Sequence, residues 1–230
     1  MLYRAHDVRD LPIYSIGEAA FYLRIAPATL RSWVLGRDYK TSEGIANFDP
    51  LIAVPDDGVT KLSFNNLVEA HVLRALRTKH DVTILSVRKA IKFAENKLRI
   101  ERLLISEQLQ TSAGDLFIEK YGQLINLSQS GQLAIKTLLE SYLQRIERDD
   151  KLLPKKLYPF ISRENAGDRR KTIVIDPQVS FGKPTISNKG ITTAALVSRV
   201  DAGESVEELA EDYNLEQKEI VDAIVYEQAA

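Results

Sequence analysis

The residues that could carry catalysis or hold a metal are few and scattered. The 230-residue chain has no cysteine, and its histidines are His6, His71 and His80. No two of them have the i, i+4 spacing of a helical metal pair, and no serine–histidine–acid group can be argued. Asp149-Asp150 is typical of a turn rather than of a catalytic dyad. We therefore expect no metal, no cofactor and no enzymatic activity.

Gly182-Lys183 is not a phosphate-binding loop. The earlier glycine of such a loop would fall at Pro177, and the lysine is followed by Pro184 instead of serine or threonine. We expect a rigid loop that leads into the helices behind it.

The chemistry that the sequence favours is DNA binding by a short helix over residues 27–35. Pro27 suits the first turn, and Gly36 ends the helix. One face is apolar: Leu30, Trp33 and Val34. The other face is polar and basic near the helix start, as a recognition helix requires: Thr29, Arg31 and Ser32. Arg31 can pair with guanine, and the two hydroxyl groups can bond phosphates or bases.

The elements around this helix are predicted from caps and turns. Ser15 and Glu18 form a capping box for a helix that precedes residues 27–35. A break of three residues separates the two helices, which together predict a helix-turn-helix. Apolar runs at 51–54 and 59–62 flank Pro55-Asp-Asp-Gly58, which predicts a hairpin wing. Arg37, Lys40 and Lys61 would then meet the DNA backbone.

Two further helices are expected after Ser63 and Thr83. The outer side of the second is basic: Arg88, Lys89 and Lys92. Over 101–161 we expect a small antiparallel sheet, with strands at 103–105, 116–118 and 123–127, and then a long amphipathic helix at 130–148. Leu157–Phe160 is expected to be an edge strand.

The predicted fold class is mainly α with small β elements (α+β), in three parts. These are a winged helix-turn-helix (1–100), a sheet-plus-helix unit for dimerisation or partner binding (101–161) and, after a charged linker (162–171), a three-helix module (172–230). Thr192 or Thr193, and Ser205 with Glu208, would cap its first two helices. A strand is expected at 172–175.

The charge is unevenly distributed. The net charge is −1, but residues 1–100 and 101–200 each carry +4, and residues 201–230 carry −9. A phosphate backbone repels such a tail, so we expect it to bind protein rather than DNA. With no cysteine, no apolar run of about 18 residues and no signal peptide, we expect a cytoplasmic protein without a membrane partner.

The first part resembles the MerR-type winged-helix domain over about residues 12–98. The residues that carry the resemblance are Tyr14-Ser-Ile-Gly-Glu-Ala-Ala20, Thr29–Trp33, Leu62-Ser-Phe64 and Val82-Thr-Ile84. The chain departs from that family by a longer insert before the wing. It also lacks the cysteines of the metal-sensing members, so the resemblance does not imply metal sensing.

The last part resembles the small helix-turn-helix domain of many type II antitoxins. The similarity runs from Ile173-Val-Ile-Asp-Pro through Phe181-Gly-Lys-Pro-Thr-Ile186 and Ala202–Tyr213 to Glu219-Ile220, and departs at Ser187–Gly190. Joined to a MerR-like front, the chain resembles VapB-type antitoxins. The resemblance implies an antitoxin that inhibits a PIN-domain ribonuclease toxin and represses its own operon through operator DNA. We expect it to bind the DNA as a homodimer, because helix-turn-helix motifs read paired half-sites.

Two alternatives remain open. One is a stand-alone MerR-like regulator that senses a small molecule in a pocket formed by residues 101–127. The other is an adaptor protein that makes no contact with DNA.

Overall fold

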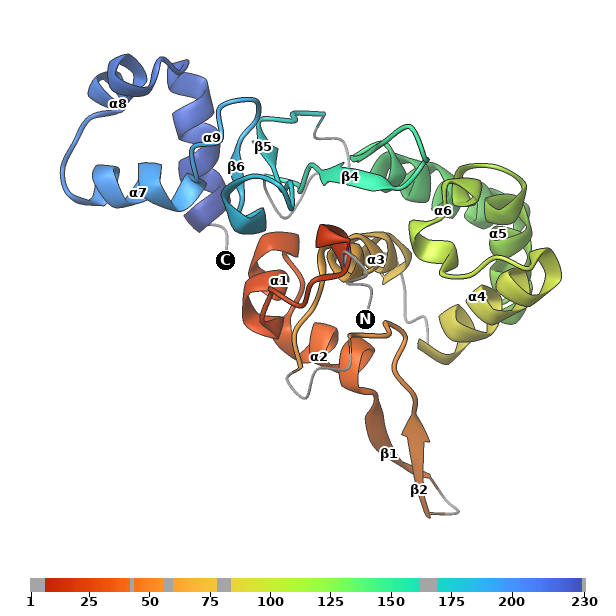
Figure 1. Ribbon diagram of the computed structural model, residues 1–230. Coiled ribbons are helices and arrows are strands. Elements are labelled where there is room, and N and C mark those ends of the chain that lie inside the picture. The colour runs from red at the N-terminus through yellow and green to blue at the C-terminus, as the bar shows by residue number, and fades with distance from the viewer. Residues whose placement is uncertain (1–6, 42–43, 56–59, 78–83, 162–168, 229–230) are drawn as a thin grey trace, which may run out of the picture.

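The computed structural model describes residues 7–41, 44–55, 60–77, 84–161 and 169–228 (Figure 1). The described helices are α1 (Ile16–Leu23), α2 (Pro27–Leu35), α3 (Phe64–Arg77), α4 (Ile84–Leu98), α5 (Ser112–Leu124), α6 (Gln129–Leu143), α7 (Thr193–Asp201), α8 (Val206–Tyr213) and α9 (Gln217–Gln228). Short 3-10 turns are η1 (Val8–Asp10), η2 (Leu103–Ile105), η3 (Glu107–Gln110) and η4 (Ser180–Gly182). The mainly helical α+β class is confirmed.

The strands form three separate antiparallel pairs. They are β1 (Arg37–Thr41) with β2 (Gly44–Phe48), β3 (Ile146–Arg148) with β4 (Pro154–Leu157), and β5 (Ile173–Val174) with β6 (Thr185–Ile186). The expected edge strand is therefore β4, three residues earlier than predicted. The strand expected at 172–175 is present as β5. None of the described helices is long and apolar enough to cross a bilayer.

The first apolar core is built around α3, which is buried along almost its whole length. Ser63 caps this helix as predicted, because its Oγ accepts a hydrogen bond from the Asn66 amide at 3.2 Å. Helices α1 and α6 and the strand β4 all contact α3. The cap predicted at Thr83 lies outside the described residues.

The sheet predicted over 103–127 is wrong. Residues 103–105 form η2, residues 116–118 lie inside α5, and 123–127 contain the end of α5 and the turn after it. The buried side chains of α5 include Phe117, Ile118 and Tyr121, and the helix packs against α4 and α6. Apolar runs of three to five residues do not distinguish a strand from a helix that is buried by its neighbours.

The helix predicted at 130–148 is shorter than expected, because α6 ends at Leu143. The buried Arg145 follows, and its guanidinium donates to the carbonyl oxygens of Tyr158 at 2.5 Å, Pro159 at 2.9 Å and Arg170 at 2.7 Å. These bonds turn the chain, so that 146–148 becomes the strand β3 instead of continuing the helix.

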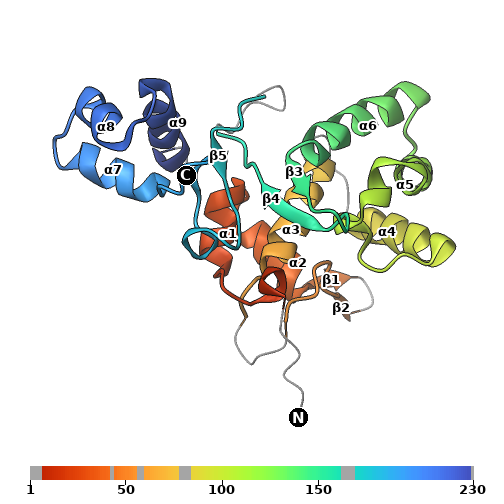
Figure 2. The same ribbon diagram turned by 45° about the horizontal axis from the view of Figure 1, so that its top comes forward.

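A second apolar core lies among β5, β6 and α7–α9. The predicted caps of its helices are confirmed: Thr192 caps α7, and Ser205 with Glu208 forms a capping box on α8. The amide groups of Leu157 and Ile175 each donate to the other's carbonyl oxygen, at 3.0 and 2.8 Å. The last residue of β4 is therefore paired with the residue that follows β5 (Figure 2).

Candidate nucleic-acid interface

Helices α1 and α2 follow one another with a three-residue connection, as predicted. The Ser15–Glu18 capping box is present, and the hydrogen bond from the Ser15 hydroxyl lowers the pKa of Glu18. Arg24 ends α1 in the left-handed conformation (φ 56°), and Pro27 opens α2. The buried side of α2 consists of Leu30, Trp33 and Val34. The local sequence therefore determines this pair of helices.

The outer side of α2 carries the three predicted contact residues. The Arg31 side chain is exposed, and Thr29 and Ser32 are half-buried. The Ser32 hydroxyl donates to the Thr29 carbonyl oxygen at 2.7 Å, so its proton is already used within the helix. Arg31 is thus the charged group on α2 that is available to a phosphate or a base edge.

A hairpin does follow α2, but not at the predicted place. It is formed by β1 and β2, in the segment that the sequence suggested was a polar insert. Residues 51–55 are not a strand, and the expected Pro55–Gly58 turn lies largely outside the described residues. Arg37 is the first residue of β1, directly after Gly36, and is exposed; Lys40 lies farther along the same strand. The hairpin projects away from the helices (Figure 1).

Residues 49–54 attach the base of the hairpin to α2. The amide groups of Leu51 and Ile52 both donate to the Trp33 carbonyl oxygen, at 2.7 and 3.0 Å. Ile52 is fully buried. The structure therefore brings Arg31 and Arg37 together on one continuous unit.

Lys61 lies away from the hairpin. It is exposed, and its neighbour Leu62 pairs with Tyr14 just before α1. Lys61 therefore lies beside the start of α1, because the described part of the predicted strand, residues 60–62, pairs with Tyr14 instead of extending into a wing. The basic face predicted on α4 also needs a correction: Lys89 and Lys92 are exposed, but Arg88 is buried (8% exposed).

The C-terminal helix α9 packs on α1. The Tyr226 hydroxyl donates to the Tyr22 carbonyl oxygen at 3.0 Å, and the Arg24 guanidinium lies 4.4 Å from the centre of the Tyr226 ring. The Tyr14 hydroxyl donates to the Gly182 carbonyl oxygen, also at 3.0 Å. Gly182 belongs to the loop that the sequence predicted as rigid. These contacts join the acidic end of the chain to the first helix.

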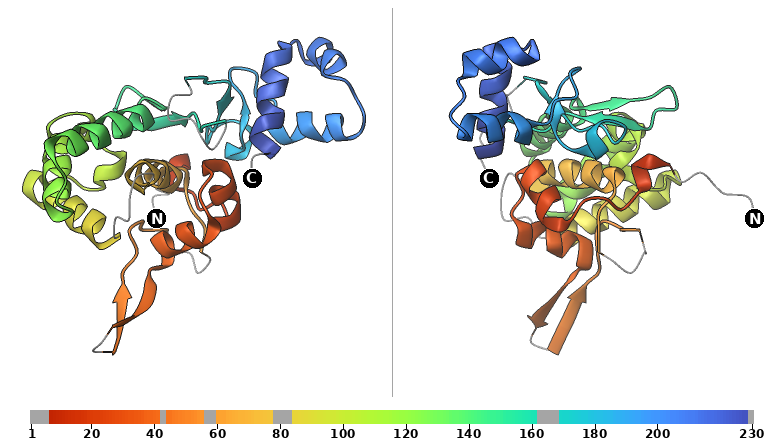
Figure 3. Two further views of the ribbon diagram at one scale, coloured as in Figure 1. Left: turned by 180° about the vertical axis from the view of Figure 1, so that it is seen from behind. Right: turned by 60° about the vertical axis from the view of Figure 1, so that its left-hand side comes forward.

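The acidic module and the hairpin point in different directions (Figure 3). Exposed carboxylates cover α8 and its flanks: Asp201, Glu207, Glu208, Glu211, Asp212 and Glu216. The few basic groups nearby are engaged: Arg199 pairs with Glu204 and Asp212, and Arg170 pairs with Asp222. The strongly negative surface thus lies apart from the exposed arginines of α2 and β1.

Residues 173–226, the C-terminal module, match the family described as "Protein of unknown function (DUF433)". Along almost its entire length, the chain is 28% identical to "Putative antitoxin VapB45" of Mycobacterium tuberculosis, over 233 residues that cover 94% of this chain and 93% of that protein. The chain is thus similar to a protein named as a VapB antitoxin. It is also 26% identical over 229 residues to "Uncharacterized protein Rv2308" of the same organism, and this alignment covers 94% of this chain and 90% of the relative.

The fold is also found in a solved structure. The X-ray crystal structure of Rv2018 from M. tuberculosis superposes with a TM-score of 0.65 and 21% identity, covering 94% of this chain and 98% of that one. The arrangement of helices and small sheets described above is therefore shared by a protein of very different sequence.

Proposed function

We propose that this chain is the antitoxin of a type II toxin–antitoxin pair, without enzymatic activity, and that it represses its own operon. The observation that carries the proposal is the similarity to VapB45, which spans both the α2–hairpin unit and the acidic module. Operator DNA would be contacted by Arg31 and Thr29 on α2 and by Arg37 and Lys40 on β1. Ser32 and Lys61 would have secondary roles.

The charge distribution supports two different partners. Arg31 and Arg37 are exposed on one unit, where they can neutralise phosphates or bond guanine. The −9 tail repels DNA but is suited to a basic protein surface. We assign homodimerisation and inhibition of a PIN-domain ribonuclease to the 101–161 region or to the acidic tail.

Toxin neutralisation is tested by a growth assay in a bacterial host. The reading frame adjacent to this gene is induced with and without the full chain. If the product of the adjacent reading frame arrests growth and this chain relieves the arrest, the antitoxin assignment is supported. A harmless neighbour, or arrest that this chain leaves unchanged, refutes it.

DNA binding is tested with the variant Arg31→Ala and a gel-shift titration on the promoter region at several salt concentrations. If Arg31 pairs with a base, we expect a loss of about 1–3 kcal/mol of binding free energy. If Arg31 contacts a phosphate, the slope of the logarithm of the binding constant against the logarithm of the salt concentration should become smaller by about 0.9. Lys155→Ala is the matched control, because it removes one exposed positive charge on β4, far from α2 in the fold. Equal effects of the two variants would exclude α2 as the recognition helix.

A further inference from the structure

A cavity of about 620 Å³ lies between α4, η2 and the segment that follows the hairpin. Its volume is within the range of small-molecule sites in proteins, which is roughly 300–1,000 Å³. Part of the wall is apolar and comes from Leu51, Ile91, Ile100 and Leu104. The rest is charged, so the cavity combines an apolar surface with groups that can fix an ion.

Basic groups predominate in the charged part of the wall. Three acidic residues line the cavity, and four basic residues do so: Arg88, Lys92, Arg99 and Arg102. Two of the acids are already engaged. Glu69 accepts hydrogen bonds from Arg102 Nε and Asn66 Nδ2, both at 2.9 Å, and Glu95 accepts one from the Leu103 amide at 3.0 Å. Arg102 is in turn paired with Glu69 and Asp10, so two exposed cations, Lys92 and Arg99, and one exposed acid, Glu101, remain at the cavity rim.

Two of these arginines are held in an unusual backbone conformation. Arg99 (φ 55°) and Arg102 (φ 52°) are both left-handed, a region that favours glycine. A glycine at either position would fit the turn better but would remove a cation from the cavity wall. Arg102 also has a buried Nη2 atom without a hydrogen-bond partner among the described residues.

We propose that this cavity binds a small organic anion, namely a phosphate or carboxylate group carried on an apolar body. Arg88 and Arg102 form the inner charged wall, and the exposed Lys92 and Arg99 lie at the rim. The anionic group binds these cations, and the apolar body packs on Ile91 and Leu104. Binding of this ligand does not depend on the proposed DNA contacts.

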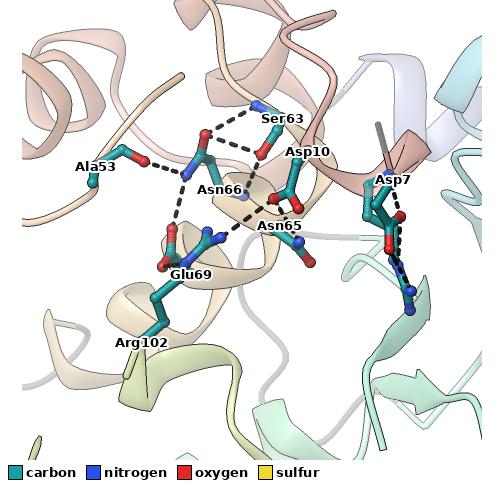
Figure 4. Close-up of polar contacts among 9 residues, drawn as sticks. Asp7, Asp10, Ala53, Ser63, Asn65, Asn66, Glu69 and Arg102 are labelled. Atoms are coloured by element: carbon teal, nitrogen blue, oxygen red, sulfur yellow. Dashed lines mark hydrogen bonds and ion pairs between the residues drawn. The ribbon is translucent and has the colours of Figure 1, made fainter. Parts of the chain in front are cut away.

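A chain of hydrogen bonds leads from Arg102 in the cavity wall to Ala53, in the segment that follows the hairpin (Figure 4). Arg102 donates to Glu69, Asn66 donates to both Glu69 and the Ala53 carbonyl oxygen, and each of these bonds is 2.9 Å long. Ala53 also lines the cavity and follows Ile52, whose amide is bonded to Trp33 of α2. A bound anion that draws Arg102 away from Glu69 thus alters the segment that holds α2, and this second step rests on the proposed function.

The binding site is tested on the full chain by thermal denaturation. The probes are phenyl phosphate, inorganic phosphate and phenol, compared at matched ionic strength. We expect phenyl phosphate to raise the melting temperature by about 4–7 °C at a concentration about twentyfold above its dissociation constant. Inorganic phosphate should give a smaller rise, and phenol none. No rise with either phosphate compound overturns the proposal.

The variant Lys92→Gln/Arg99→Gln removes two exposed cations from the rim and keeps their hydrogen-bonding side chains. It should bind phenyl phosphate at least tenfold more weakly, whereas Lys97→Gln, an exposed change on the same helix outside the cavity, should bind it normally. Circular dichroism without ligand confirms that each variant folds. Equal phenyl phosphate affinity in both variants overturns the site.

Promoter DNA separates this inference from the proposed function. In one outcome, the wild type does not bind phenyl phosphate, and the rim variant binds DNA more weakly and with a smaller dependence on salt concentration. The rim cations then contact DNA phosphates, and the small-molecule site is refuted. If phenyl phosphate binds and changes DNA affinity, the coupling to α2 is supported. If it binds and leaves DNA affinity unchanged, the site is supported and the coupling is overturned.

Discussion

His71 should make the stability of the protein depend on pH well above the range in which carboxylates titrate. The side chain is completely buried on α3, against the rings of Tyr142 and Phe160, and its Nε2 donates to the Tyr142 carbonyl oxygen at 3.1 Å. Burial, together with the charges of Arg145 and Arg74, lowers the pKa of His71 from 6.5 to about 3. The folded protein therefore holds His71 neutral.

The size of the effect follows from this difference in pKa. Below pH 6.5 the unfolded chain binds a proton at His71 that the folded chain does not bind until about pH 3. The neutral His71 therefore does not reduce the free energy of unfolding above pH 6.5. Below pH 6.5, the free energy of unfolding falls by about 1.4 kcal/mol for each pH unit. Between pH 8 and pH 5 the free energy of unfolding should decrease by about 2 kcal/mol from this residue alone.

The assay is urea denaturation at pH 8, 6.5 and 5 on the wild type and on His71→Gln. The glutamine amide can still donate to the Tyr142 carbonyl oxygen, but it does not titrate. Carboxylates with a lowered pKa, such as Glu18 and Glu208, lose their stabilising effect only as the pH falls below about 4.5, outside this window. The same loss of stability in both proteins would show that His71 is not the buried neutral group described here.

Two further predictions concern the joint between the C-terminal module and α1. Gly182→Ala should cost about 2 kcal/mol or more, because its Cβ would lie 2.1 Å from the Tyr14 hydroxyl oxygen and its φ is +72°. Gly203→Ala, with a φ of +102° and nothing within 4 Å, should cost only about 1 kcal/mol; equal losses in urea denaturation would contradict the close contact. Tyr226→Phe should cost about 1 kcal/mol, because the part-buried Tyr22 carbonyl oxygen loses its donor. An unchanged urea midpoint would contradict that hydrogen bond.

Several elements could be predicted from the sequence because short-range signals determine them. The capping boxes at Ser15 and Ser205, the proline that opens α2 and the apolar faces of the helices all act within one or two turns of chain. Arg31 and Arg37 could be named as candidate contacts for the same reason: each lies in, or directly after, a helix with a clear apolar side. The roles of both residues in DNA binding remain predictions.

The errors occurred where long-range packing decides the structure. Residues 116–118 were predicted to be a strand, yet they belong to α5, because α4 and α6 bury them on several sides. The turn residues Asp57-Gly58 favour a hairpin over residues 51–62, whereas the structure has its hairpin earlier, at β1 and β2. Gly44, with a φ of 129° at the start of β2, was its weak local signal.

By itself the sequence determined the described helices other than α5, the caps at Ser15, Ser63, Thr192 and Ser205, the fold class and the charge separation between the two ends of the chain. Only the tertiary structure decided where the hairpin lies, that Arg88 and Arg102 share a cavity wall, and that Tyr226 packs on α1 more than 200 residues away. Caps and periodicity act over a few residues, whereas burial is decided by segments that meet only after the chain has folded.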